Sequence, residues 1–137
     1  FESYYRWRLD LHEFGIWKGR RIVTHGEFVQ ELRGIIEGSL LLTVLERRSL
    51  APIGFVQVYD HSHEDGWAFF TVYVADGYRS KGHGAEAGLL LLDYLFSYYA
   101  LRKLYADTLE FNQQSLSSLQ SAGFEVEGRR IDHAFLH

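Results

Sequence analysis

The sequence contains no cysteine and no methionine, and Pro52 is its only proline. Without cysteine the chain forms no disulfide and offers no thiolate as nucleophile or metal ligand, which favours a cytoplasmic protein. The single proline and the absence of low-complexity stretches exclude a proline-rich linker, so we expect one compact unit. The first residue is Phe1 rather than methionine, as expected of a fragment of a longer natural chain.

The sequence also lacks a long apolar run and a strong excess of one charge. The apolar stretch from Leu89 ends at Asp93, far short of the roughly 18 to 20 residues that a membrane span needs. A formal net charge of -4 gives no basic field for nucleic acid or anionic membranes. Instead, 47% hydrophobic and 16% aromatic residues provide ample material for one buried core. We therefore expect a soluble single domain that binds neither nucleic acid nor membrane.

Hydrophobic periodicity predicts two helices followed by three strands. Tyr4, Trp7 and Leu11 recur at helical spacing within the first dozen residues. Thr24 to Glu27 matches the S/T-x-x-E capping box, in which hydroxyl and carboxylate satisfy each other's backbone donors, so a second helix is expected to begin there. After Gly38 the apolar period changes to two. The three strands expected there, joined as an antiparallel meander, span residues 40–46, 53–60 and 67–75.

The second half of the chain alternates helices and strands. Over residues 84–100, an apolar helical face is formed by Ala85, Leu89, Leu92, Phe96 and Tyr99, and it leads to an expected strand over 103–110. A strand, helix, strand unit of this kind usually makes a right-handed parallel crossover. Asn112 is a preferred N-cap for a further helix, which Gly123 is expected to end. Short strands are expected over residues 124–127 and 131–136. The predicted fold class is therefore α+β, with a mixed sheet.

The segment from Arg79 to Ala85, Arg-Ser-Lys-Gly-His-Gly-Ala, joins the third expected strand to its helix. Glycines at such a turn let the backbone approach a ligand closely, and a helix N-terminus offers unpaired N–H groups and the positive end of the dipole. Arg79 and Lys81 add positive charge beside it. We interpret the segment as a diphosphate cradle, and the alternative interpretation is a tight turn that binds nothing.

Two other phosphate loops fit this segment less well. A Walker loop needs G-x-x-x-x-G-K-[ST], but Lys81 precedes both glycines. A dinucleotide fingerprint would have Ala87 at its third glycine position, and it should open a parallel βαβ unit. Here antiparallel strands come first, so this interpretation is disfavoured.

The string R-x-x-G-x-G from Arg79, preceded by Val72 to Val74 and followed by an apolar helix, resembles the acetyl-CoA signature of the GNAT acetyltransferases. The resemblance extends over nearly the whole chain. The strings N-x-x-S from Asn112 and G-F-x-x-E-G from Gly123 are similar to those of the RimJ/RimL-type branch, whose members acetylate protein N-termini. The sequence departs from the family at Asp76, where a proline is common.

The resemblance implies a single N-acetyltransferase domain over residues 1–137 that lacks the family's first and last strands. Its fold would be the acyl-CoA N-acyltransferase fold, a centrally splayed mixed sheet flanked by helices. The third meander strand and the strand after the signature helix would separate to admit the pantetheine arm of acetyl-CoA, and a backbone N–H near Val74 would stabilise the tetrahedral oxyanion. The residues implied in cofactor binding are Val72 and Val74 for the arm, Asn112 for the far side of its channel, and Arg79, Ser80, Lys81, Gly82, His83, Gly84 and Ala85 for the pyrophosphate.

The catalytic residues are expected near Asn112. Ser115 matches the serine of N-x-x-S and would donate the proton that the leaving thiolate takes up; the alternatives are a surface serine and a proton from water. Many family members have a tyrosine one turn later as the general acid, where this sequence has Leu119. Among the acidic residues near strand ends, Glu110 is the candidate general base, because it would end the splayed strand close to Asn112.

No metal is expected. His61 and His63 have an H-x-H spacing that suits metal ligands, but they belong to an expected hairpin turn, and no third ligand is evident.

These inferences predict an N-acetyltransferase that moves the acetyl group of acetyl-CoA to a primary amine, on a protein N-terminus or a small molecule, by direct attack. A CoA-binding sensor or regulatory module with the same fold and no turnover is the main alternative, and Leu119 favours it. A third alternative is a partner-binding domain whose glycine turn is only structural. A homodimer is left open.

Overall fold

The computed structural model describes residues 1–13 and 23–131. The chain divides into two compact units. One comprises Phe1–Gln30 together with Thr108–His137, and the other comprises Glu31–Asp107. Among the described residues, no helix is both long and apolar enough to span a membrane.

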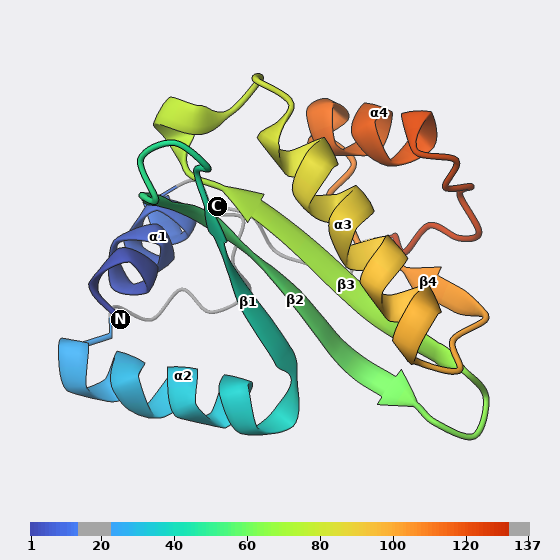
Figure 1. Cartoon of the computed structure of the whole chain (residues 1–137), viewed down its shortest axis with the longest axis horizontal. Coiled ribbons are helices and arrows are strands. Elements are labelled where there is room, and N and C mark those ends of the chain that lie inside the picture. The colour runs from blue at the N-terminus through green and yellow to red at the C-terminus, as the bar shows by residue number, and fades with distance from the viewer. Residues whose placement is uncertain (14–22, 132–137) are drawn as a thin grey trace. The chain divides into compact units, whose positions relative to one another are not determined.

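Within the described residues, the unit Glu31–Asp107 is built on a four-stranded mixed sheet in the order β1-β2-β3-β4 (Figure 1). Its strands are β1 (Leu40–Leu45), β2 (Pro52–Ser62), β3 (Trp67–Val74) and β4 (Lys103–Tyr105). The first three form the antiparallel meander that the alternating pattern predicted, and β4 pairs with β3 in parallel. The predicted α+β class with a mixed sheet is therefore confirmed.

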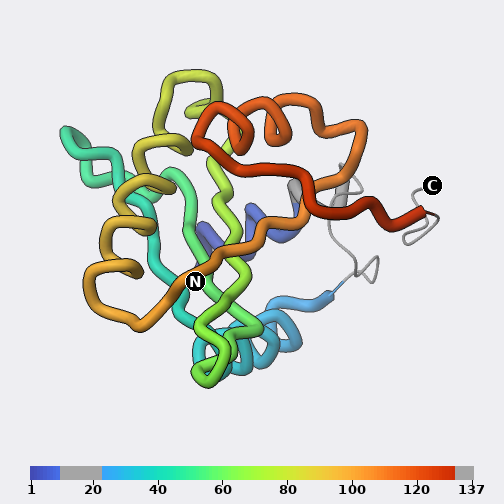
Figure 2. The backbone as a smooth tube through the Cα atoms, turned by 90° about the vertical axis from the view of Figure 1, so that its right-hand side faces the viewer, coloured from blue at the N-terminus to red at the C-terminus, as the bar shows by residue number. Residues whose placement is uncertain are grey.

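Helix α3 (His83–Tyr98) carries the chain from the end of β3 back to the start of β4, after the short 3-10 helix η1 (Asp76–Tyr78). The predicted helix is present, but its predicted apolar face is wrong: Leu89, Phe96 and Tyr99 are exposed, whereas Leu91 and Leu95 are buried. The buried face includes Gly88 instead, because a glycine there lets the helix pack closely on Val72 of β3. Figure 2 shows the loop before α3 and the β2–β3 hairpin at opposite ends of the strands. The loop that holds the glycine motif is thus built at the carboxyl end of β3.

The described part of the unit formed by Phe1–Gln30 and Thr108–His137 contains helices joined by irregular chain. The ring of Tyr5 lies 5.4 Å from that of Phe28, and its hydroxyl donates to the Val23 carbonyl at 3.4 Å. These contacts join the first helix to the start of the second. The helices are α1 (Glu2–Glu13), α4 (Gln113–Ser121) and the beginning of α2 (His25–Gly38), whose remaining residues belong to the other unit.

Two helix ends predicted from capping residues are confirmed. At the start of α2, the Glu27 carboxylate accepts from the Thr24 N–H at 2.8 Å, and the Thr24 hydroxyl accepts from the Glu27 N–H at 3.3 Å. At the end of α4, Gly123 adopts a φ of 91°, and the Phe124 N–H donates to the Leu119 carbonyl at 3.0 Å. A left-handed glycine with such a closing bond is the common C-terminal cap.

Two predicted strands are wrong. The strand expected over residues 103–110 ends at Tyr105, because the parallel ladder stops at the pair Phe69–Tyr105 and the chain beyond has no strand beside it. Residues 124–127 form no strand, because no strand of the described sheet pairs with them to satisfy their N–H and C=O groups. The strand expected over 131–136 lies outside the described residues, apart from Ile131 in a turn.

Candidate functional site

One edge of β3 loses its strand neighbour partway along. The parallel ladder with β4 ends at Phe69, whereas the antiparallel ladder with β2 continues to Val74. The Ala75 N–H donates to the Ile53 carbonyl at 2.7 Å, so this N–H is directed toward β2. Because backbone groups alternate along a strand, the N–H and C=O groups of Val72 and Val74 are directed to the other edge. The two strands therefore separate where the predicted valines lie.

On its β2 side, this end of β3 is held closely. A Cβ placed on Gly54 would stand 2.1 Å from the Tyr73 carbonyl oxygen and 3.1 Å from the Val74 Cα. No side chain fits at such distances, so only glycine lets β2 approach this part of β3.

On one face, β3 is covered by the glycines of α3. A Cβ on Gly84 would lie 3.4 Å from a methyl carbon of Val74, and one on Gly88 would lie 3.7 Å from a methyl carbon of Val72. The valine side chains thus pack under the helix, while their backbone groups are directed along the plane of the sheet. Gly84 serves this packing, and its own N–H belongs to the first turn of α3.

The first turn of α3 offers backbone donors. Ser80 and Gly82 have φ values of 59° and 85°, and these left-handed conformations turn the chain into the helix. The first helical bond at this end runs from the Glu86 N–H to the Gly82 carbonyl at 3.0 Å. The N–H groups of His83 to Ala85 come before it and have no carbonyl partner within the helix. Since Gly82 has no side chain to cap them, this N-terminus is suited to an anion.

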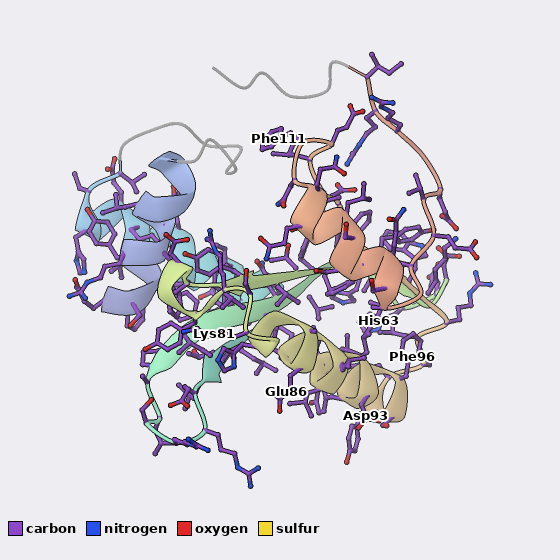
Figure 3. The ribbon with its side chains drawn as sticks, turned by 90° about the horizontal axis from the view of Figure 1, so that it is seen from above. His63, Lys81, Glu86, Asp93, Phe96 and Phe111 are labelled. Atoms are coloured by element: carbon purple, nitrogen blue, oxygen red, sulfur yellow. The ribbon has the colours of Figure 1, made fainter. Side chains whose placement is uncertain are left out.

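The side chains of Lys81 and His83 lie against Tyr78 at the same turn. Lys81 Nζ donates to the Gly77 carbonyl at 3.0 Å and lies 5.8 Å from the centre of the Tyr78 ring. The His83 ring lies 6.3 Å from that same tyrosine ring. Figure 3 shows Lys81 at the N-terminal end of α3, with Glu86 farther along the helix. Lys81 thus places a positive charge at the N-terminal end of α3.

The turn between β1 and β2 contributes a carboxylate to the surroundings of His83. Hydrogen bonds from the Ser49 hydroxyl at 2.5 Å and the Ser49 N–H at 2.8 Å lower the pKa of Glu46, and the charge of His83 lowers it further. Glu46 therefore carries its negative charge over a wider pH range than an ordinary glutamate.

Arg79 is turned toward the end of β3. Its Nε donates to the Val74 carbonyl at 2.8 Å, and its Nη1 donates to the Asp76 carboxylate at 3.0 Å. The guanidinium carbon lies 5.6 Å from the centre of the Tyr73 ring. The side chain expected to place charge beside a phosphate thus makes three contacts within the protein.

The remaining predicted residues, Glu110, Asn112 and Ser115, lie together at the start of α4, in the other unit. The Asn112 side-chain oxygen accepts from the Ser115 N–H at 3.2 Å, so the expected N-cap is present. Glu110 is exposed and forms an ion pair with Arg129. Ser115 is half-buried. The predicted site residues therefore form two groups, one in each unit.

Sequence reasoning missed Asp76 and Tyr78 as organising residues of the loop. Asp76 bonds Arg79, and Tyr78 contacts the side chains of both Lys81 and His83. The available signal was the i, i+3 spacing of Asp76 and Arg79, which is suited to an ion pair.

His61 and His63 contact each other at the end of β2. Their Nε2 atoms lie 2.9 Å apart, and they belong to no group of three or more potential ligands among the described residues.

Comparison with known proteins gives one consistent result. The family model described as an acetyltransferase (GNAT) domain matches residues 2–125. Spermidine N(1)-acetyltransferase of Escherichia coli K12 is 29% identical over 84 residues, which cover 61% of this chain and 45% of that protein. The chain thus spans about half the length of the curated relatives that it matches.

Solved structures share the fold. Spermidine N-acetyltransferase of Vibrio cholerae, crystallised with CoA and spermine, matches with a TM-score of 0.84 at 20% identity over 96% of this chain and 81% of that one. Ribosomal-protein-S5-alanine acetyltransferase of Vibrio fischeri matches with a TM-score of 0.72 at 18% identity over 84% of this chain and 69% of that one. At these identities the likeness concerns the fold alone.

Proposed function

The chain belongs to the GNAT acetyltransferase family, and from that premise we propose that it transfers the acetyl group of acetyl-CoA to a primary amine. The amine nitrogen attacks the thioester carbonyl carbon, a C–N bond forms and the C–S bond breaks. The amine loses a proton and the CoA thiolate gains one, so the products are an N-acetylamine and CoA. No covalent enzyme intermediate is needed, in keeping with a sequence without cysteine.

The observation that carries this proposal is the backbone arrangement at the end of β3. An unpaired helix N-terminus, suited to a pyrophosphate, directly follows a strand edge that β4 has left. In the proposed complex the N–H groups of residues 82–85 bind the pyrophosphate, with Ser80 and Lys81 beside them. The strand edge at Val72 and Val74 binds the pantetheine arm, with the thioester at the Val74 N–H. These groups fit acetyl-CoA. The N–H groups and Lys81 suit its phosphates, and the free edge of β3 suits the amide groups of its pantetheine arm.

Stabilisation of the reaction's oxyanion is assigned to the Val74 N–H. A preorganised N–H aimed at the developing charge is worth more in the transition state than in the ground state, and so it raises kcat. Its direction away from β2 supports this assignment.

Ser115 is proposed as the proton donor to the thiolate, with Asn112 lining the pantetheine channel. Glu110 is proposed as the base that receives the proton of the incoming ammonium. Its exposed ion pair with Arg129 leaves it accessible to solvent, as a base acting through water requires. The support for these roles is the N-x-x-S string and the grouping of the three residues at the start of α4.

The proposed acceptor is a small amine of the polyamine type. The support is the similarity to spermidine N(1)-acetyltransferase of Escherichia coli, which covers 61% of this chain. A protein N-terminus is the second candidate, favoured by the RimJ/RimL-like strings and by the fold shared with a ribosomal-protein acetyltransferase. We also propose one catalytic domain and a cytoplasmic location, on the single family match and the absence of cysteine.

Thermal unfolding with acetyl-CoA, combined with a thiol-release assay, tests the proposal. Acetyl-CoA at about 100 times its dissociation constant should add roughly 2.7 kcal/mol to the free energy of unfolding. Spermidine and a peptide with a free N-terminus are then compared as acceptors, and we expect faster thiol release with spermidine. Stabilisation without thiol release from any amine would identify a CoA sensor, as Leu119 favours. The absence of stabilisation would mean that the glycine turn is only structural.

A further inference from the structure

The peptide unit between Val74 and Ala75 is held on both sides. Its N–H donates to the Ile53 carbonyl at 2.7 Å, and its C=O accepts from Arg79 Nε at 2.8 Å. The guanidinium is in turn fixed by the Asp76 carboxylate at 3.0 Å. The Arg79 side chain is 32% exposed and that of Asp76 is 74% exposed, so the arginine is the less solvated member of the pair.

The C=O and N–H groups of Val74 point to the same edge of β3. This is the edge from which β4 has departed, and the one assigned above to the thioester. A bare carbonyl there would present its negative end next to the N–H that stabilises the oxyanion. A cation bonded to that carbonyl offsets this unfavourable dipole and fixes the orientation of the peptide.

We propose that Arg79 is a positioning residue for acetyl transfer, which orients the end of β3 through the Val74 carbonyl, rather than a ligand of the cofactor phosphates. The proposal rests on the proposed function. It assigns the loop's phosphate binding to the backbone N–H groups and to Lys81. It also gives Asp76 a role, as the partner that holds the guanidinium against the strand.

The two roles of Arg79 predict different substrate dependence. A phosphate ligand matters only when phosphate is present, whereas a residue that orients β3 matters equally for a thioester without phosphate. S-Acetylpantetheine carries the same thioester and arm as acetyl-CoA and has no phosphate, so it separates the two roles.

The test compares wild type with Arg79→Gln and Arg79→Lys on both thioesters, using spermidine or the best amine found. Glutamine keeps an N–H donor and loses the charge, and lysine keeps the charge and loses the planar fork. We expect both variants to lower kcat by about tenfold, by the same factor for the two thioesters, with little change in KM. Asp76→Asn, which keeps an acceptor oxygen, should show a smaller loss in the same pattern. Circular dichroism and the melting temperature check that each variant is folded.

Two results would overturn the inference. A loss with acetyl-CoA that is absent with S-acetylpantetheine would make Arg79 a phosphate ligand, and unchanged kinetics with both thioesters would remove it from the reaction. If wild type itself releases no thiol, the proposed enzymatic function fails instead. The inference is then decided by calorimetric titration of CoA and of pantetheine into the same proteins. Because a positioning residue adds little to ground-state binding, unchanged affinity for both ligands supports the inference, and loss for CoA alone refutes it.

Discussion

The N-termini of α3 and α4 differ in whether a side chain of the protein caps their first backbone N–H groups. At α4 the Asn112 side chain accepts from the Ser115 N–H, so the helix is capped from within the chain. At α3 the residue in the capping position is Gly82, which has no side chain to offer. Serine, aspartate and asparagine are the preferred capping residues, and none stands at this position, which leaves the donors to an external anion. The comparison separates a helix start built for stability from one built for binding.

The largest expected effect is on the uncapped helix. Gly82→Asp is compared with Gly82→Asn, since both side chains tolerate the left-handed region and differ only in charge. Two like charges about 4 Å apart repel by about 4 kcal/mol at an effective dielectric constant of about 20, so the aspartate variant should bind acetyl-CoA roughly 1,000-fold more weakly than the asparagine variant. Calorimetric titration measures this difference.

The melting temperature without ligand provides the control for Gly82. The melting temperature of Gly82→Asp should equal or slightly exceed that of Gly82→Asn, because a negative charge at a helix N-terminus interacts favourably with the helix dipole. Equal affinities for acetyl-CoA in the two variants would show that the N-terminus of α3 does not bind the phosphates. The two helices would then differ in their capping residue but not in ligand binding.

The second effect concerns the hydroxyl in the first turn of α4. Ser115→Ala should lower kcat by about 10²-fold if the hydroxyl protonates the leaving thiolate, with the affinity for acetyl-CoA nearly unchanged. The helix should persist, because Asn112 still caps it and alanine is the better helix former. Ser117→Ala, a change at an exposed serine of the same helix, is the matched control in the kinetic assay. Normal turnover of the Ser115 variant would show that the hydroxyl donates no proton in the reaction and that the start of α4 is only structural.

The third effect tests the cap itself. Asn112→Ala should lower the free energy of unfolding by about 1 kcal/mol, whereas Asn112→Ser retains a capping oxygen and should lose much less. Chemical denaturation measures both values. If Asn112 also lines the pantetheine channel, both variants will bind CoA more weakly. An unchanged affinity in both would limit the residue to capping.

The smallest effect is expected at α2, whose capping box is complete. Glu27→Gln keeps an oxygen for the Thr24 N–H and loses the charge, so the free energy of unfolding should fall by less than about 1 kcal/mol. Affinity for acetyl-CoA should not change. A large loss of affinity would mean that this helix start also takes part in ligand binding, contrary to the contrast drawn for α3.

Local signals predicted most of the elements. The capping box of α2, the N-cap of α4 and the glycine end of α4 each depend on residues within one turn, and all three are present. The alternating apolar pattern predicted the three meander strands within two residues at their ends. The glycine loop was likewise placed correctly between strand and helix, because its neighbours on both sides have clear periods.

What the sequence did not predict depends on partners distant along the chain. The expected strand over residues 103–110 has strand character in composition, but only three of its residues find a parallel neighbour. The direction of the Arg79 side chain depends on where the Val74 carbonyl lies after folding, and no local pattern encodes it. The motif therefore predicted where the backbone of the candidate site lies, but it did not predict which groups the long side chains of the site contact.

Gly54 has a consequence for how mutations in this protein should be interpreted. It lies in β2 and is assigned no ligand, yet any side chain there would displace the Tyr73 carbonyl, with which a Cβ would collide at 2.1 Å. The displaced atom belongs to the peptide that carries the Val74 N–H. In a saturation mutagenesis selection for activity, position 54 should therefore reject every replacement, alanine included, and mimic a residue of the active centre. A site mapped from mutational tolerance would therefore extend to β2, one strand beyond the surface that the ligand contacts.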